Sequence, residues 1–86
     1  MDGGSGTEMP MVTINMQRTG ENIQSLRLEN GISVQDLADI LGFSTTHIIY
    51  RWQRGEVLPS VDSLVVLSGI FGVSINEIIA VDSIPA

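Results

Sequence analysis

The sequence contains no cysteine and no lysine, and only four of its 86 residues are aromatic. The absence of cysteine excludes disulfides, thiol chemistry and cysteine-ligated zinc. No apolar run approaches the ~20 residues that a membrane-spanning helix needs. The first residues show neither the basic cluster nor the apolar segment of a secretory signal. We therefore expect a soluble, cytoplasmic protein that does not enter a membrane.

Positive charge is also scarce. Four arginines stand against ten acidic residues, and the formal net charge is −6. Taken over the whole chain, this balance argues against a nucleic-acid partner. A duplex, however, senses mainly the charge within about a Debye length, ~8 to 10 Å, of the contact face. The distribution of the charges must therefore decide.

The two N-terminal segments differ in pattern from the rest of the chain. Residues 1–10, MDGGSGTEMP, are glycine-rich and polar without periodicity. We interpret them as a disordered leader or a cloning remnant, and residues 11–86 as one domain. Residues 11–16, MVTINM, alternate apolar and polar side chains and predict a short extended segment across the core. One such strand cannot form a sheet alone, so the fold class must come from the remaining residues.

A glycine, an apolar residue and a serine recur together at residues 31–33, 42–44 and 72–74. Glycine can end a helix in the left-handed conformation, and a serine two residues later can cap the next helix. The apolar residue between them can pack on the fourth position after the cap, which is Leu37, Ile48 or Ile78. A longer boundary ends at Ser60, a further capping serine. These boundaries divide the chain into short helices.

Five helices are predicted, at residues 20–30, 34–41, 45–54, 61–71 and 75–81. Isolated helices of this length are marginal in water, so packing of their apolar faces must stabilise them. The candidate core residues are Ile23, Leu26, Leu37, Leu41, Ile49, Trp52, Leu64, Leu67, Phe71, Ile78 and Ile79. The sequence thus predicts an all-α fold, a compact five-helix bundle with crossed helices.

The second and third predicted helices are joined by residues 42–44, a turn that is typical of two helices near a right angle. Ala38 supplies the small side chain needed where they cross. Apolar residues on both sides of the turn fix the inner face of the third helix, so its outer face points to solvent. This is the geometry of a helix-turn-helix unit, expected over residues 34–54.

Residues 23–79 resemble the Cro and phage-repressor-type helix-turn-helix domains of bacterial and phage transcription regulators. The resemblance is carried by Leu37-Ala38, Leu41-Gly42, Tyr50-Arg51-Trp52-Gln53-Arg54-Gly55, Leu58-Pro59-Ser60 and Phe71-Gly72-Val73-Ser74. The family often has a glutamine directly after the cap of its second helix, where this chain has Val34 followed by Gln35. The turn from Ser44 to His47 is one residue longer than usual. The resemblance implies binding of double-stranded DNA, with the third helix in the major groove.

The third predicted helix carries the candidate site. His47, Arg51 and Arg54 lie at i, i+4 and i+7, with Tyr50 beside them, opposite the apolar stripe. No acidic residue occurs between residues 42 and 55, so this segment carries a local charge of +2. Hydroxyls and free N–H groups at the helix start can bind phosphates, and the longer side chains can reach bases. The candidate DNA-binding residues are Gln35, Ser44, Thr45, Thr46, His47, Tyr50, Arg51 and Arg54, with Arg27 as a flanking phosphate contact.

Some of these side chains also have purely structural interpretations. Trp52 follows the buried stripe and is expected to anchor the core. Arg54, next to a capping glycine, can stabilise the C-terminal end of its helix through the helix dipole. His47 is the single histidine, and no metal cluster, phosphate-binding glycine loop or activated nucleophile accompanies it. We therefore predict no enzyme activity, no cofactor and no metal.

The sequence predicts a sequence-specific DNA-binding transcriptional regulator that acts as a weak homodimer or as part of a larger assembly. Residues 78–84 are either the dimer surface or packing on the first helix. The alternative is a protein–protein interaction module on the same fold with little DNA affinity, which the net charge of −6 motivates. Salt separates the two, because DNA binding through arginines weakens as salt rises whereas an apolar contact changes little.

Overall fold

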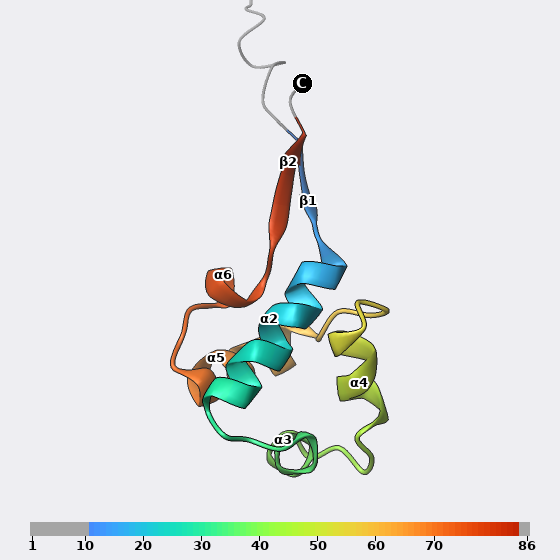
Figure 1. The fold of residues 1–86 in the computed structure, drawn as a ribbon, viewed down its shortest axis with the longest axis vertical. Coiled ribbons are helices and arrows are strands. Elements are labelled where there is room, and N and C mark those ends of the chain that lie inside the picture. The colour runs from blue at the N-terminus through green and yellow to red at the C-terminus, as the bar shows by residue number, and fades with distance from the viewer. Residues whose placement is uncertain (1–10, 85–86) are drawn as a thin grey trace, which may run out of the picture.

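The computed structural model describes residues 11–84. Its elements in chain order are β1 (Met11–Ile14), α2 (Met16–Glu29), α3 (Val34–Leu41), α4 (His47–Gln53), α5 (Val61–Phe71), α6 (Ile75–Ile78) and β2 (Val81–Ile84). Figure 1 shows the helices gathered into one body, from which β1 and β2 project together. The predicted five-helix fold is confirmed, with a small sheet added. The predicted leader, residues 1–10, lies outside the described residues.

Helices α3 and α5 have the predicted bounds because local signals mark both of their ends. The hydroxyls of Ser33 and Ser60 each accept a hydrogen bond from the backbone N–H three residues later, at 3.0 and 3.2 Å. Both helices end at glycines in the left-handed conformation, Gly42 with φ 76° and Gly72 with φ 67°. Only glycine adopts this conformation without a Cβ penalty, so the sequence defines these two helices locally.

Helix α2 begins four residues earlier than predicted, at Met16. The cap is Asn15, whose Oδ1 accepts a hydrogen bond from the N–H of Arg18 at 2.9 Å. Asparagine is a strong N-cap residue, and this one lies in the segment that the alternating pattern had assigned to extended structure. The first turn of α2 therefore replaces the end of the predicted strand.

Helices α4 and α6 are shorter than predicted. Helix α4 begins at His47 after Thr46, which makes no capping hydrogen bond through its side chain, so the expected cap at Ser44 was wrong. Helix α6 ends at Ile78, because Ile79 has the extended backbone angles φ −82° and ψ 122°. The chain then continues as β2, whose first residue, Val81, belongs to the predicted last helix.

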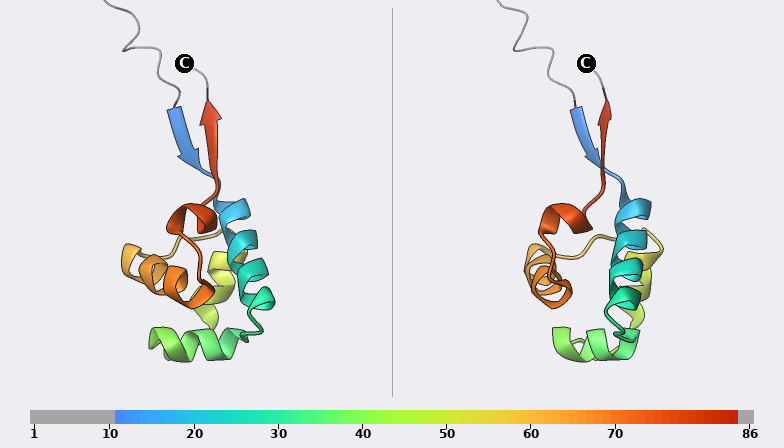
Figure 2. Two further views of the ribbon diagram at one scale, coloured as in Figure 1. Left: turned by 90° about the vertical axis from the view of Figure 1, so that its left-hand side faces the viewer. Right: turned by 60° about the vertical axis from the view of Figure 1, so that its left-hand side comes forward.

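The expectation that residues 11–16 cross the core was wrong. Strand β1 instead pairs antiparallel with β2, with Met11 opposite Ile84, and all four β1 residues are exposed. Figure 2 shows this two-stranded ribbon extending away from the helices in both views. Its partner strand lies at the other end of the chain, so no local pattern could announce the pairing.

The ribbon is tied to the start of α2 by polar contacts. The carboxylate of Asp82 accepts hydrogen bonds from Arg18 Nη1 and from Asn15 Nδ2, both at 3.1 Å. The backbone N–H of Asn15 donates to the Ala80 carbonyl at 2.8 Å, and the Ala80 N–H donates to the buried Thr19 hydroxyl at 2.9 Å. The two chain ends are thus joined to each other before they leave the helical body.

The core lies between the helices and contains every predicted core residue. Most are buried, whereas Leu26, Leu41 and Ile79 are partly buried and pack against the others. Trp52 is only 2% exposed, and its ring meets that of Phe43 edge to face with centroids 5.7 Å apart. The expected core role of Trp52 is therefore confirmed. Over residues 11–84, no helix combines the length and the apolarity required to cross a membrane.

Candidate nucleic-acid interface

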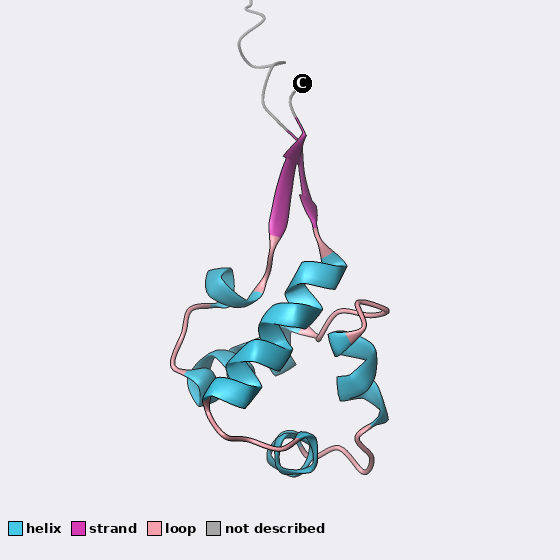
Figure 3. Cartoon of the chain, viewed as in Figure 1, coloured by secondary structure: helices cyan, strands magenta, loops and turns pink. Residues whose placement is uncertain are grey.

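Helices α3 and α4 form the predicted two-helix unit. The turn between them begins at Gly42, and the N–H of Phe43 donates back to the Ala38 carbonyl at 2.9 Å. Ala38 has no exposed surface, as expected for a small residue at a crossing. In Figure 3, α3 is seen along its axis while α4 is seen from the side, so the two helices cross steeply. This arrangement leaves the outer face of α4 free.

Gly20 sets the distance between α2 and α4. A Cβ atom on this residue would lie 2.2 Å from the Trp52 carbonyl oxygen and 2.8 Å from the Gln53 carbonyl oxygen. The last turn of α4 therefore contacts the backbone of α2 directly, which only glycine permits. In the sequence, Gly20 marks only a predicted helix boundary, because a helical glycine gives no local signal of a close approach.

Arg27 holds the same two helices together through hydrogen bonds. Its Nε donates to Gln53 Oε1 at 3.0 Å, and its Nη1 donates to the Ile32 carbonyl at 2.9 Å. The residue is only 9% exposed. Its expected role as a flanking phosphate contact is therefore corrected, because the guanidinium is buried and used within the fold. Buried arginines require such partners, and these fix the inner side of α4.

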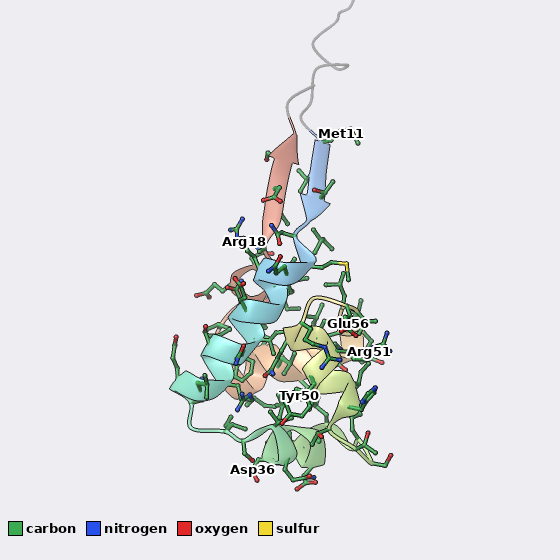
Figure 4. All side chains as sticks on the ribbon, turned by 45° about the vertical axis from the view of Figure 1, so that its right-hand side comes forward. Met11, Arg18, Asp36, Tyr50, Arg51 and Glu56 are labelled. Carbon is green, nitrogen blue, oxygen red and sulfur yellow. The ribbon has the colours of Figure 1, made fainter. Side chains whose placement is uncertain are left out.

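The structure brings most of the predicted site residues to one surface, formed by α4 and the turn before it. The exposed members are Ser44, Thr45, His47, Tyr50 and Arg54, and the half-buried members are Thr46 and Arg51. Figure 4 shows Tyr50 and Arg51 on α4. Gln35 is also exposed but lies on α3, where its amide donates to Asp39 Oδ1 at 3.0 Å. The surface thus offers hydroxyls, an imidazole, a phenol and two guanidinium groups.

The charge of this surface differs from the expectation because of Glu56. Arg54 Nε donates to Glu56 Oε2 at 2.6 Å, and Arg51 Nε donates to Glu56 Oε1 at 3.3 Å. The expected +2 over residues 42–55 ended one residue short of this carboxylate, which reduces the sum to +1. Figure 4 shows Glu56 next to Arg51. The sequence feature that indicates this pairing is an acidic residue two positions after Arg54.

These contacts change the acid–base properties of the pair. The hydrogen bond and the charge of Arg54 lower the pKa of Glu56, and Arg51 adds to this effect. The same hydrogen bond raises the pKa of Arg54. Both groups are therefore held in their charged forms at neutral pH, as opposite charges in contact require.

Comparison with known proteins assigns the helices around α3 and α4 to a family. The helix-turn-helix family model matches residues 23–78, which run from within α2 to the end of α6. The chain belongs to the helix-turn-helix family. The predicted resemblance is thereby confirmed, and the ribbon of this helix-turn-helix protein lies outside the matched residues.

One sequence relative and two solved structures give further context. A Pyrococcus furiosus protein named as an HTH-type transcriptional regulatory protein is 33% identical over 72 residues. The match takes in 78% of this chain but 22% of that protein, so this chain spans about a fifth of its relative. The restriction-modification controller protein C.AhdI from Aeromonas hydrophila has a similar fold, with TM-score 0.65 and 20% identity over 74% of this chain and 96% of that one. The DNA-binding domain of BldD has TM-score 0.62 and 18% identity over 76% and 93%.

Proposed function

We propose that this chain binds double-stranded DNA in a sequence-specific manner as a transcriptional regulator, with α4 in the major groove. The observation that carries the proposal is the outer face of α4, which presents polar and cationic side chains while Gly20 and Arg27 fix its inner face. A recognition helix needs both properties, since base contacts depend on an exposed face held in a defined position. The names of the relative and of the BldD domain support the same class of function. The proposal includes no catalytic activity.

The proposed contacts to bases and to phosphates involve different side chains. Contacts to base edges or to the DNA backbone are proposed for Tyr50, Arg51 and His47, because these side chains project from the centre and the start of the exposed face of α4. The hydroxyls of the turn, together with Gln35 on α3, are proposed to contact phosphates. Arg54, at the end of α4, is proposed to contact a phosphate as well. These hydroxyls belong to Ser44, Thr45 and Thr46.

The experiment is selection of bound duplexes from a random-sequence pool, followed by affinity measurement on the selected site. Arg51→Ala should weaken binding by about 1 to 3 kcal/mol if the guanidinium contacts a base, and should relax the sequence preference at the contacted base pair. Arg18→Ala is the matched control, because it makes the same charge change at the base of the ribbon, and the two variants are compared at a concentration where sedimentation gives both the same oligomeric state. Equal losses for the two variants would contradict a recognition role for α4.

A protein–protein interaction module on the same fold is the second candidate. The pairing of Glu56 with both arginines favours it, because this pairing removes half of the local positive charge. Dependence on salt separates the candidates. Binding to phosphates loses affinity steeply as salt rises, with a log–log slope set by the number of phosphates neutralised. A partner bound through apolar contacts would show little change.

We also propose that the chain works as a homodimer in the cytoplasm, through the ribbon. Of the predicted dimer surface, Ile78 is buried in the core, whereas Val81 is 49% exposed. The register places Val81 opposite Ile14 and on the same face as Val12, and these two are 44% and 61% exposed. A lone two-stranded ribbon is marginal in water, and this face, which is uncharged and apolar except for Ser83, can pack on its own copy. Sedimentation equilibrium should show a dimer that Val12→Asp abolishes, whereas a monomer at every concentration would contradict it.

A further inference from the structure

Glu56 lies next to the proposed DNA-binding face without belonging to the predicted site. Each of its carboxylate oxygens accepts from a guanidinium, and Arg54 Nη2 adds a third bond at 3.3 Å to the oxygen that Arg51 contacts. The two arginines are three positions apart and therefore share one side of α4. One carboxylate thus pairs with both cationic side chains of the face, as Figure 4 shows for Arg51.

The backbone holds Glu56 in this place. Its N–H donates to the Arg51 carbonyl at 2.9 Å, and the preceding Gly55 turns the chain with φ 75°. Gly55 itself is packed against α2, where an added Cβ would lie 2.9 Å from Gln17 Cα. Because the turn is fixed by a hydrogen bond and by packing, the carboxylate is presented to the arginines by the fold.

The ion pairs are nevertheless exposed enough to exchange. The side chains of Arg51, Arg54 and Glu56 are 40%, 53% and 45% exposed. Exposed ion pairs contribute little to folding stability and are screened by salt, so a second anion can compete for the guanidinium groups. A phosphate is such an anion.

We propose that Glu56 competes with DNA phosphates for Arg51 and Arg54 and so lowers affinity for every duplex, which leaves appreciable binding only where base contacts add to the phosphate contacts. This inference rests on the proposed function of α4. On a non-specific duplex, each arginine exchanges one anion for another and gains little. On the cognate site, bidentate bonds to a base edge add to that exchange and make displacement of Glu56 favourable.

The test compares Glu56→Gln with Glu29→Gln. Both variants change the net charge from −6 to −5 with an isosteric side chain. Glu29 lies on α2, two positions from buried Arg27, and so projects from nearly the opposite side of that helix. Affinities are measured by fluorescence anisotropy for a mixed-sequence duplex and for the selected duplex, at about 50 and 150 mM salt.

Glu56→Gln should raise affinity for the mixed-sequence duplex roughly threefold to tenfold at low salt and steepen the salt slope by about one. Affinity for the selected duplex should rise by about the same factor, because the same ion pairs are lost in both complexes, and Glu29→Gln should match the parent in both assays. Glu56→Ala should behave as Glu56→Gln does, because it also removes the carboxylate. Equal affinities for the parent and Glu56→Gln, or a loss in Glu56→Gln, would overturn the inference alone. Failure of the parent and of every variant to bind any duplex would overturn the proposed function as well.

Discussion

Gly20 provides a quantitative test of the packing that positions α4. Alanine in place of a glycine inside a helix normally stabilises it by about 1 kcal/mol. Here the new Cβ would lie 2.2 Å from the Trp52 carbonyl oxygen, whereas ordinary C···O contacts are ~3.3 Å or longer. The helices must separate by about 1 Å, and overpacking against backbone costs about 3 kcal/mol, the upper end of the usual range. We therefore expect Gly20→Ala to lower the free energy of unfolding by about 2 kcal/mol.

Gly69 offers a matched control. It also lies inside a helix, α5, but is exposed, and an added Cβ would meet nothing within 4 Å. Gly69→Ala should therefore stabilise the protein by about 0.5 to 1 kcal/mol. Thermal and urea unfolding, followed by circular dichroism, should give opposite signs for the two variants, with Gly20→Ala melting roughly 10 °C below the parent. A Gly20→Ala variant as stable as Gly69→Ala would refute the close approach of α2 and α4.

Three further predictions follow from other contacts. Gly55→Ala should destabilise the fold by more than Gly31→Ala in urea unfolding, because both glycines have positive φ but only Gly55 meets backbone at 2.9 Å; equal losses would argue against that contact. Arg27→Met should lower the free energy of unfolding by about 1 to 3 kcal/mol, since it leaves buried acceptors without a donor; an unchanged urea midpoint would contradict this role. The pKa of Glu56, lowered by Arg54, should rise in Arg54→Gln when followed by NMR. The stabilisation from this pair is present above the unfolded-state pKa and is lost as the pH falls through the lower folded-state value; an unshifted titration in Arg54→Gln would refute the pairing.

The parts of the fold that could be predicted are those with local physical causes. Helices α3 and α5 were predicted to the residue because a serine begins each one and a left-handed glycine ends it. The ribbon was not predicted, because Met11 and Ile84 pair across the whole described chain. Hydrophobic alternation over four residues indicates a strand but says nothing about its partner. The early start of α2 was missed for a related reason, since Asn15 lies inside the alternating segment.

The candidate site shows the same division. The spacing of His47, Arg51 and Arg54 was enough to place them on one face, since helical geometry follows from sequence separation. Their electrostatic environment was not predicted, because a sharp turn at Gly55 folds Glu56 back onto α4. The burial of Arg27 likewise depends on how α2 meets α4. The sequence pattern therefore predicts which residues share the exposed face of α4. The positions of Glu56 and Arg27 relative to that face depend on tertiary contacts.

Helix α4 is the proposed DNA-binding element. The most direct test is an NMR titration of isotope-labelled protein with a mixed-sequence duplex at low salt, repeated at physiological salt, following each backbone amide. We expect the chemical-shift changes to concentrate on residues 44–54 and to fade as salt rises, while the amide signals of the ribbon and α5 stay unchanged. An absence of shift changes at low salt, or changes concentrated on another surface, would contradict a DNA-binding role for α4.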